Sequence, residues 1–147
     1  MLIRRAKLTD LDFIQAELQK FSDFYASKYS LFGKSSAYRI EKISDLINNH
    51  LFFVAELNYE PVGFICGTLY GHFFNPEIKT LTELWWWVKD EYRNTRAGAM
   101  LLNTFIRYGE ENCQWIFMTL EHGSPVKPDS LLKRGFKLKE NNYLLEI

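Results

Sequence analysis

The feature that most constrains this sequence is a strand-like segment that passes, within a few residues, into a helix. Thr80–Val88 is rich in aromatic and β-branched side chains, which predicts a strand. Lys89–Thr95 is polar, and from Arg96 to Glu110 apolar side chains recur at helical spacing. The chain must therefore hold the end of a strand close to the start of a helix, which favours a fold that mixes both kinds of element.

Hydrophobic periodicity predicts further strands and helices on both sides of this segment. Upstream of it we expect, in chain order, a strand at Leu2–Ala6, a helix from Thr9 or Asp10 to Phe21, a loop at 22–35, a helix at Tyr38–Asn48, a strand at Leu51–Leu57, a turn at 58–60, a strand at Pro61–Tyr70 and a loop at Gly71–Lys79. Downstream of it we expect a strand at Trp115–Leu120, a loop at Glu121–Pro128, a helix at Asp129–Arg134 capped by Gly135, and strands at Phe136–Lys139 and Tyr143–Ile147.

The order of these elements predicts the fold class. It is β-α-α-β-β-β-α-β-α-β-β, in which hairpins join several strands and helices interrupt on both sides of the middle. This pattern indicates a mixed α/β (α+β) sheet with helices on both faces, not a doubly wound parallel sheet. At 147 residues the chain fits a single domain, 1–147.

Charge and cysteine content restrict the partners and the compartment that we expect. The sequence has 18 basic and 18 acidic side chains, so it lacks the basic excess typical of duplex DNA binding. Its N-terminus carries charges where a signal peptide needs an apolar run, and no apolar stretch is long enough to span a membrane. Its two cysteines are far apart and belong to no metal-ligand pattern. We therefore expect a cytoplasmic protein without a metal; the sequence leaves its oligomeric state open, with a homodimer as one alternative.

The start of the helix near Arg96 has the properties of an anion-binding site. The first backbone N–H groups of a helix have no partner within it, and the helix dipole is positive at this end. Arg93 and Arg96 add positive charge there, and Gly98 allows another backbone to approach closely. This arrangement suits a phosphate group. The alternative is an ordinary strand-to-helix connection whose arginines lie in solvent.

This segment resembles the acetyl-CoA-binding motif of the GNAT superfamily of N-acetyltransferases. In that motif a strand ending in Val leads to Arg/Gln-x-x-Gly-x-Gly/Ala and to a helix that continues with Leu-Leu. The residues that match it here are Val88, Arg93, Gly98, Leu101 and Leu102. The resemblance covers essentially the whole chain, because Val62–Gly67 is similar to the family's third strand and Leu131–Phe136 to its last helix and the Gly-Phe that follows. The sequence is similar in style to small phage and bacterial acetyltransferases.

The resemblance implies a fold, a cofactor and a reaction. The sheet would have six to seven strands, mostly antiparallel, and acetyl-CoA would transfer its acetyl group directly to an amine of a small molecule or protein in a ternary complex. The residues implied to bind acetyl-CoA are Trp86, Val88, Arg93, Asn94, Thr95, Arg96, Ala97, Gly98 and Ala99. The pantetheine arm would lie where the fourth and fifth strands separate beyond Val88, and a backbone N–H near Trp86 or Val88 would stabilise the oxyanion.

Glu83 is the predicted catalytic base, because many family members carry a glutamate on this strand. In a regular strand Glu83 shares a face with Trp85 and Trp87, and a carboxylate between two tryptophans loses solvation and becomes more basic. Such a group accepts a proton directly or through water. The alternatives are that Glu83 lies at the solvent edge or pairs with a lysine, and that His122 or Glu121 is the base instead.

Two positions depart from the family pattern. Arg96 stands where the motif has its first glycine, although its backbone N–H is still available. Leu131 stands where many members carry the tyrosine that protonates the departing thiolate of CoA. Tyr108, Tyr143, Ser124 and water are alternatives for that role, and the sequence does not choose among them.

The acceptor is expected, by the same resemblance, beside the loops Ser22–Ser36 and Gly71–Lys79. The aromatic side chains that would form the floor of its site, or would simply pack onto the sheet, are Phe24, Tyr25, Tyr29, Phe32, Phe73 and Phe74. One rival hypothesis is a degenerate family member that binds a partner without turnover. Another is a nucleic-acid-directed protein whose aromatic residues stack on unpaired bases. The basic residues available for it are Lys28, Lys34, Arg39 and Lys42.

Overall fold

The structure, a computed structural model, describes residues 1–25, 33 and 35–147. Its elements are β1 (Leu2–Arg5), a 3-10 turn (Leu8–Asp10), α1 (Leu11–Tyr25), α2 (Ser36–Asn49), β2 (Leu51–Leu57), β3 (Glu60–His72), β4 (Asn75–Val88), a second 3-10 turn (Asp90–Tyr92), α3 (Ala97–Asn112), β5 (Trp115–Phe117) and α4 (Pro128–Leu132). None of the helices in these described ranges is long and apolar enough to cross a bilayer.

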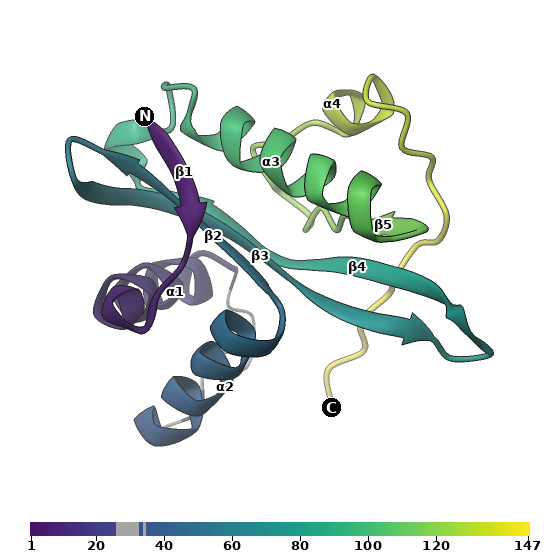
Figure 1. Ribbon diagram of the computed structural model, residues 1–147, viewed down its shortest axis with the longest axis horizontal. Helices are drawn as coiled ribbons and strands as arrows, with labels where there is room; N and C mark the ends of the chain where they lie inside the picture. The colour runs from purple at the N-terminus through teal and green to yellow at the C-terminus, as the bar shows by residue number, and fades with distance from the viewer. Residues whose placement is uncertain (26–32, 34) are drawn as a thin grey trace.

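The strands form one sheet in which the spatial order follows the chain order, from β1 to β5 (Figure 1). Neighbouring strands from β1 to β4 are antiparallel, whereas β4 and β5 are parallel. α3 crosses one face of the sheet, and α1 and α2 lie on the other (Figure 1). The predicted class, a mixed and mostly antiparallel sheet with helices on both faces, is confirmed.

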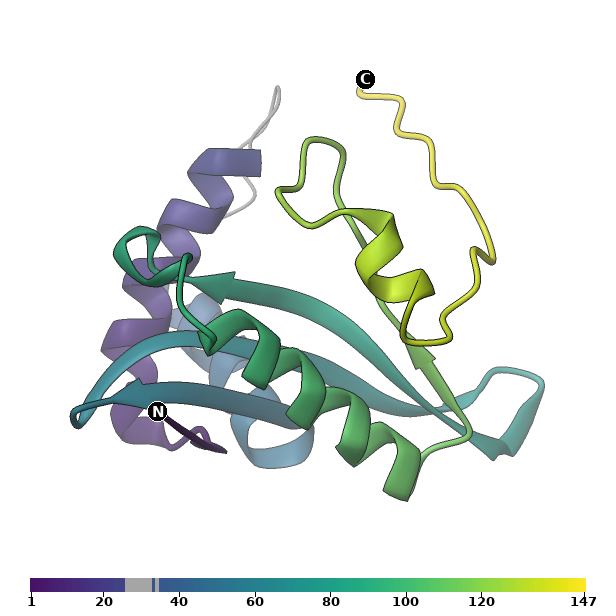
Figure 2. The same cartoon turned by 90° about the horizontal axis from the view of Figure 1, so that it is seen from above.

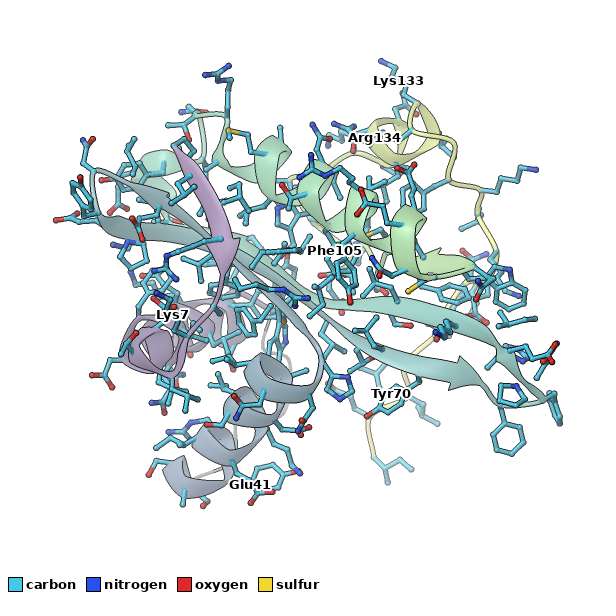
Figure 3. All side chains as sticks on the ribbon, in the orientation of Figure 1. Lys7, Glu41, Tyr70, Phe105, Lys133 and Arg134 are labelled. Carbon is cyan, nitrogen blue, oxygen red and sulfur yellow. The ribbon has the colours of Figure 1, made fainter. Side chains whose placement is uncertain are left out.

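Each face of the sheet has its own hydrophobic core, because the helices are amphipathic and turn their apolar stripes toward it. The core beneath α3 joins Leu101 and Phe105 to Ile65 and Leu81. Figure 3 shows Phe105 pointing from α3 toward the sheet. The core beneath α1 and α2 has a separate set of members, among them Ile14, Leu18, Ile43, Phe64, Cys66 and Trp87. The two cores hold β3 and β4 from both sides.

Two tight hairpins build the middle of the sheet. The turn predicted at 58–60 is confirmed, since Asn58 and Tyr59 adopt positive φ angles of 51° and 67°, as a hairpin turn requires. The loop predicted at Gly71–Lys79 is wrong: β3 and β4 continue through it and leave only residues 73–74 as the turn. Pro76 is tolerated on β4 because the ladder is irregular opposite it, so no backbone donor is needed.

The first two helices, α1 and α2, extend beyond their predicted limits. α1 continues to Tyr25 instead of Phe21, because Phe24 and Tyr25 gain aromatic contacts there. Ser22–Tyr25, predicted as loop, is therefore helical, and residues 26–32 and 34 of that loop lie outside the described part of the chain. α2 begins at Ser36 because the Ser35 hydroxyl accepts a hydrogen bond from the Tyr38 N–H and caps the helix.

The C-terminal edge of the sheet is smaller than predicted. β5 ends at Phe117 instead of Leu120, and the strands predicted at Phe136–Lys139 and Tyr143–Ile147 do not form in the described chain. The sheet therefore has five strands where six to seven were predicted. A β5 of three residues offers little edge for another strand to pair with. Residues 137–147 form no helix or strand (Figure 2), and Nζ of Lys139 lies 5.7 Å from the ring centroid of Trp115 on β5.

Candidate active site

A cavity of about 520 Å³ opens between β4 and the segment that follows β5. Three parts of the chain line it: the end of α1, the second half of β4 together with the start of α3, and residues 119–126. The end of α1 and the segment after β5 are separate parts of the chain (Figure 2), and both line the cavity. The cavity therefore reaches from the α1 side of the sheet to the start of α3.

The cavity exists because β5 leaves β4 early. The two strands pair only at Thr80–Thr82, opposite Trp115–Phe117. The separation thus begins before Glu83, earlier than the predicted point beyond Val88. From Glu83 to Val88 one edge of β4 faces the cavity in place of a neighbouring strand.

A β-bulge at Leu84, beside the point where β5 separates, switches the face of the sheet to which the following β4 side chains point. The ladder pairs Glu83 and Trp85 with consecutive residues of β3, so Leu84 has no partner within the described hairpin. Leu81 packs in the core beneath α3, whereas Trp85, four residues later, packs beneath α1 and α2. The alternation that was expected to align Glu83 with Trp85 and Trp87 therefore does not extend across the bulge.

Glu83 is a buried carboxylate at the point where β4 and β5 separate. It is 7% exposed, and one of its oxygens accepts a hydrogen bond from the Thr119 N–H at 3.3 Å. Burial raises the pKa of Glu83 to about 7; the Thr119 N–H lowers it and the charge of Glu121 raises it further. Glu83 forms no ion pair among the described side chains, so both structural alternatives for it, a solvent edge and a lysine pair, are wrong. Near neutral pH it can accept a proton.

The backbone of β4 presents hydrogen-bonding groups to the cavity. The Lys89 N–H donates to the carbonyl of Val62 on β3. Since hydrogen-bonded and open pairs alternate in an antiparallel ladder, the backbone groups of Trp86 and Val88 point away from β3, toward the side that β5 has left. The Val88 carbonyl already accepts a hydrogen bond from Nε of Arg93 at 3.2 Å.

Arg93 lies along the end of β4. Its Nη2 is 2.8 Å from a carboxylate oxygen of Asp90, and its guanidinium carbon is 4.4 Å from the ring centroid of Trp87. With the bond to the Val88 carbonyl, these contacts hold the guanidinium over Trp87, and Arg93 lines the cavity there.

The start of α3 has unused backbone donors. The helix begins at Ala97, one residue later than predicted, and Thr95 Oγ1 accepts the hydrogen bond of the Ala97 N–H at 3.2 Å. No described group accepts from the N–H of Gly98 or Ala99. Arg96 is exposed beside them. The predicted residues 93–99 therefore do surround the helix start, and Gly98 also lines the cavity.

The α1 side of the cavity is packed around Trp87. Its indole N–H donates to a carboxylate oxygen of Glu17 at 2.9 Å, and the other oxygen of Glu17 accepts from Lys20 at 2.8 Å. The ring centroids of Phe21 and Phe24 lie 5.7 Å and 6.3 Å from that of Trp87. The three consecutive tryptophans pack into the cores on both faces, and all of them also line the cavity.

Ser22 is a site residue that sequence reasoning missed. It is 1% exposed, it lines the cavity, and its hydroxyl has no hydrogen-bond partner among the described residues. One signal was available: Ser22 follows Leu18 by four residues, which places a polar side chain on the buried stripe of a helix. Because the loop was predicted to begin at Ser22, helical spacing was not applied to this residue, and its buried position was not predicted.

Only some of the residues considered as alternative base or acid line the cavity. Glu121 and Ser124 line the cavity. His122 is exposed and does not line it. Tyr108 packs against Phe53, with ring centroids 6.4 Å apart, and Tyr143 is 92% exposed, so neither reaches the cavity. Leu131, at the position of the family's tyrosine, is buried in the core beneath α3.

The predicted acceptor residues are brought together only in part. Phe24 and Tyr25 line the cavity, whereas Phe73 and Phe74 lie exposed at the turn between β3 and β4 and do not line it. The rest of the predicted floor, Tyr29 and Phe32, lies outside the described residues, as do Lys28 and Lys34. The second loop, which is described in full, therefore contributes no aromatic side chain to this cavity.

Two parallel strands that separate, a helix start with free N–H groups and a buried carboxylate are the features that an acyltransferase site requires. The model of the acetyltransferase (GNAT) family matches residues 18–125. The chain therefore belongs to the acetyltransferase (GNAT) family, which confirms the predicted acyltransferase activity.

Solved structures share the fold at low sequence identity. A transcriptional regulator from Bacillus halodurans C-125 is 19% identical with a TM-score of 0.77, and the match covers 99% of each chain. An acetyltransferase from Trypanosoma brucei is 15% identical with a TM-score of 0.74, again over 99% of each chain. A ribosomal-protein-alanine N-acetyltransferase from Brucella melitensis biovar Abortus 2308 is 12% identical with a TM-score of 0.77, over 99% of this chain and 97% of that one. A comparison with curated proteins found no match.

Proposed function

We propose that this chain transfers an acetyl group from acetyl-CoA to a primary amine, with Glu83 as the base. The observation that carries the proposal is that one cavity contains both a buried carboxylate and the approach to a helix start with unpaired N–H groups. When bound, acetyl-CoA supplies an activated acetyl thioester. The residues of the chain bind it, orient the amine and take up its proton.

The start of α3 fits the pyrophosphate of CoA. The N–H groups of Gly98 and Ala99 lack acceptors in the described chain, and Arg96 adds an exposed positive charge. A Cβ added to Gly98 would come no closer than 3.7 Å to the rest of the protein, so packing within the protein does not require a glycine there. The glycine instead leaves room for a ligand, with Asn94, Thr95 and Ala97 completing the turn.

The open edge of β4 fits the pantetheine arm. The backbone groups of Trp86 and Val88 face this edge, and an N–H from either one can donate to the oxyanion that develops during transfer. Nε of Arg93 occupies one acceptor site of the Val88 carbonyl, and we expect Arg93 to move from it toward the phosphates when CoA binds.

The proton balance assigns a role to Glu83. Its carboxylate takes a proton from the amine, the nitrogen bonds to the acetyl carbon, and the bond from that carbon to sulfur breaks. Sulfur leaves with the electron pair and receives the proton that Glu83 took up, relayed by water or by the Ser124 hydroxyl, because the usual tyrosine is replaced by the buried Leu131. The products are an amide and free CoA.

Calorimetric titration with acetyl-CoA tests the binding half of the proposal. We expect micromolar affinity for the wild type, and a loss of at least about tenfold for Gly98→Leu, which fills the space in front of the helix start. Asn103→Leu, an exposed site further along α3, is the control and should bind as the wild type does. A folded wild type that does not bind acetyl-CoA would overturn the proposal.

One observation favours a second function, a family member that binds CoA without turnover. Leu131 is packed into the core where the acid would stand. Release of CoA thiol distinguishes the two functions: acetyl-CoA binding with no thiol released by any amine supports the binding protein, and release that depends on amine supports the enzyme.

A further inference from the structure

The α1 side of the cavity carries a hydroxyl that acetyl transfer alone does not require. Ser22 is 1% exposed and without a partner among the described residues, yet it lines the cavity. A buried hydroxyl with no hydrogen bond is unfavourable, and such groups in proteins usually have a partner. A polar group of a bound acceptor would supply that partner.

The wall around Ser22 is aromatic. The Phe21 and Phe24 rings contact the ring of Tyr25, with centroid distances of 4.7 Å and 4.8 Å, and both also contact Trp87. Trp87 is held in place by its bond to Glu17. A wall of mutually packed rings suits a flat apolar body, which can meet the rings edge to face or offset.

The charge of the cavity indicates which group the acceptor carries at the end that reaches Glu83. Two carboxylates line it, Glu83 and Glu121. The one cationic side chain among the described lining residues is Arg93, which is already engaged by Asp90 and by the Val88 carbonyl. The surplus is negative, so the cavity attracts an ammonium group and brings it to the base.

We propose that the acceptor is a small arylalkylamine with a hydroxyl group on its ring. Its amine lies at Glu83, its ring lies against Phe21, Phe24 and Tyr25, and its hydroxyl bonds to Ser22. This inference rests on the proposed function. The aromatic side chains that line the cavity offer few hydrogen-bond partners for the many polar groups of a polyhydroxylated polycation.

Thiol release measured with four amines tests the ranking. The probes are tyramine, 2-phenylethylamine, spermidine and a short lysine peptide. We expect kcat/KM for tyramine to exceed that for 2-phenylethylamine about tenfold, because only tyramine has a ring hydroxyl that can form a hydrogen bond with the buried Ser22 hydroxyl. Spermidine and the peptide should be slower than 2-phenylethylamine by at least about tenfold. A faster polycation or peptide would overturn the inference and leave the proposed function intact.

Ser22→Ala tests the contact itself. It should lower kcat/KM for tyramine to about that for 2-phenylethylamine, with less than about a twofold effect on the latter. Because it removes a hydroxyl that has no partner, it should not lower the melting temperature, whereas loss of a bonded serine would. Ser44→Ala on α2, away from the cavity, is the control and should keep the tyramine preference. An unchanged preference in Ser22→Ala overturns the inference. Failure of the wild type to bind acetyl-CoA removes the proposed function and this inference with it.

Discussion

The two edges of β4 differ along the same stretch of chain. Toward β3 the strand is paired almost from end to end, from Asn75 to Val88. Toward β5 it is paired only at Thr80–Thr82, and beyond that point its edge faces the cavity. The first edge holds the sheet together, and the second presents Glu83 and free backbone groups. The comparison teaches that this site arises where regular strand pairing stops.

Glu83→Gln is expected to have the largest effect, because it removes the base from the open edge and keeps its size. With acetyl-CoA and 2-phenylethylamine, kcat/KM at pH 8 should fall roughly 10²- to 10⁴-fold. The wild type should gain activity as Glu83 ionises through about pH 7, and the variant should lack that limb. Thiol release measured against pH checks both. A variant within about twofold of the wild type at every pH would exclude Glu83 as the base.

The closed edge can be broken at Gly67, which pairs with Glu83. A Cβ there would lie 2.5 Å from the carbonyl oxygen of Thr82 and 2.9 Å from the ring of Phe105. Gly67→Val should therefore lower the free energy of unfolding by about 2–4 kcal/mol in urea denaturation. Thr68→Val, a nearly isosteric change at the next residue, is the control. An unchanged midpoint for Gly67→Val would mean that the bulge can absorb a side chain.

The free energy of unfolding should also depend on the ionisation of Glu83 at the open edge. Burial raises the pKa of Glu83 from 4.5 to about 7, so the folded chain holds this proton more tightly than the unfolded chain does. The stabilisation from protonated Glu83 is fully present below about pH 4.5 and is lost as pH rises through about 7, by up to roughly 3 kcal/mol.

Urea denaturation of the wild type and of Glu83→Gln between pH 4.5 and 8 measures this loss, because the other groups titrate alike in both proteins. The wild type should weaken relative to the variant as pH rises. A difference that stays constant with pH would show that Glu83 is not buried in solution.

Trp87→Phe should have the smallest effect, since it breaks one hydrogen bond on the packed α1 side. The change removes the donor to Glu17 and leaves that buried oxygen unpaired, which costs about 1–3 kcal/mol of unfolding free energy. Trp85→Phe is the matched control, because the Trp85 indole forms no hydrogen bond among the described residues. Thermal unfolding should therefore rank Trp87→Phe below Trp85→Phe, and the reverse order would contradict the assignment.

The parts of the fold that follow from local chemistry were predictable. The turn at 58–60 and the helix start near Arg96 are marked by changes in polarity and period, and both lie within one residue of their predicted places. The helical Ser22–Tyr25 was missed because its polar residues conceal the contacts of Phe24 with Trp87. The C-terminal strands were predicted from alternation alone, which does not show whether a neighbouring edge is available.

The bulge at Leu84 was the least predictable feature of the site. An extra residue in a strand leaves its composition unchanged and shows itself only in the register with its neighbour. The residue types at Glu83, Val88 and Gly98 therefore indicated the site, whereas the facing of the tryptophans and the early separation of β5 could not be obtained from period-two alternation.

The topology of the sheet has a consequence for the order in which the protein folds. β2, β3 and β4 are consecutive hairpins with short turns, so their contacts are local and close rapidly. β5 reaches β4 only after the whole of α3 has been traversed, and the cavity has one of its walls only then. We therefore expect acetyl-CoA to leave the early phase of refolding unchanged and to slow unfolding, since the ligand recognises a feature that is completed last.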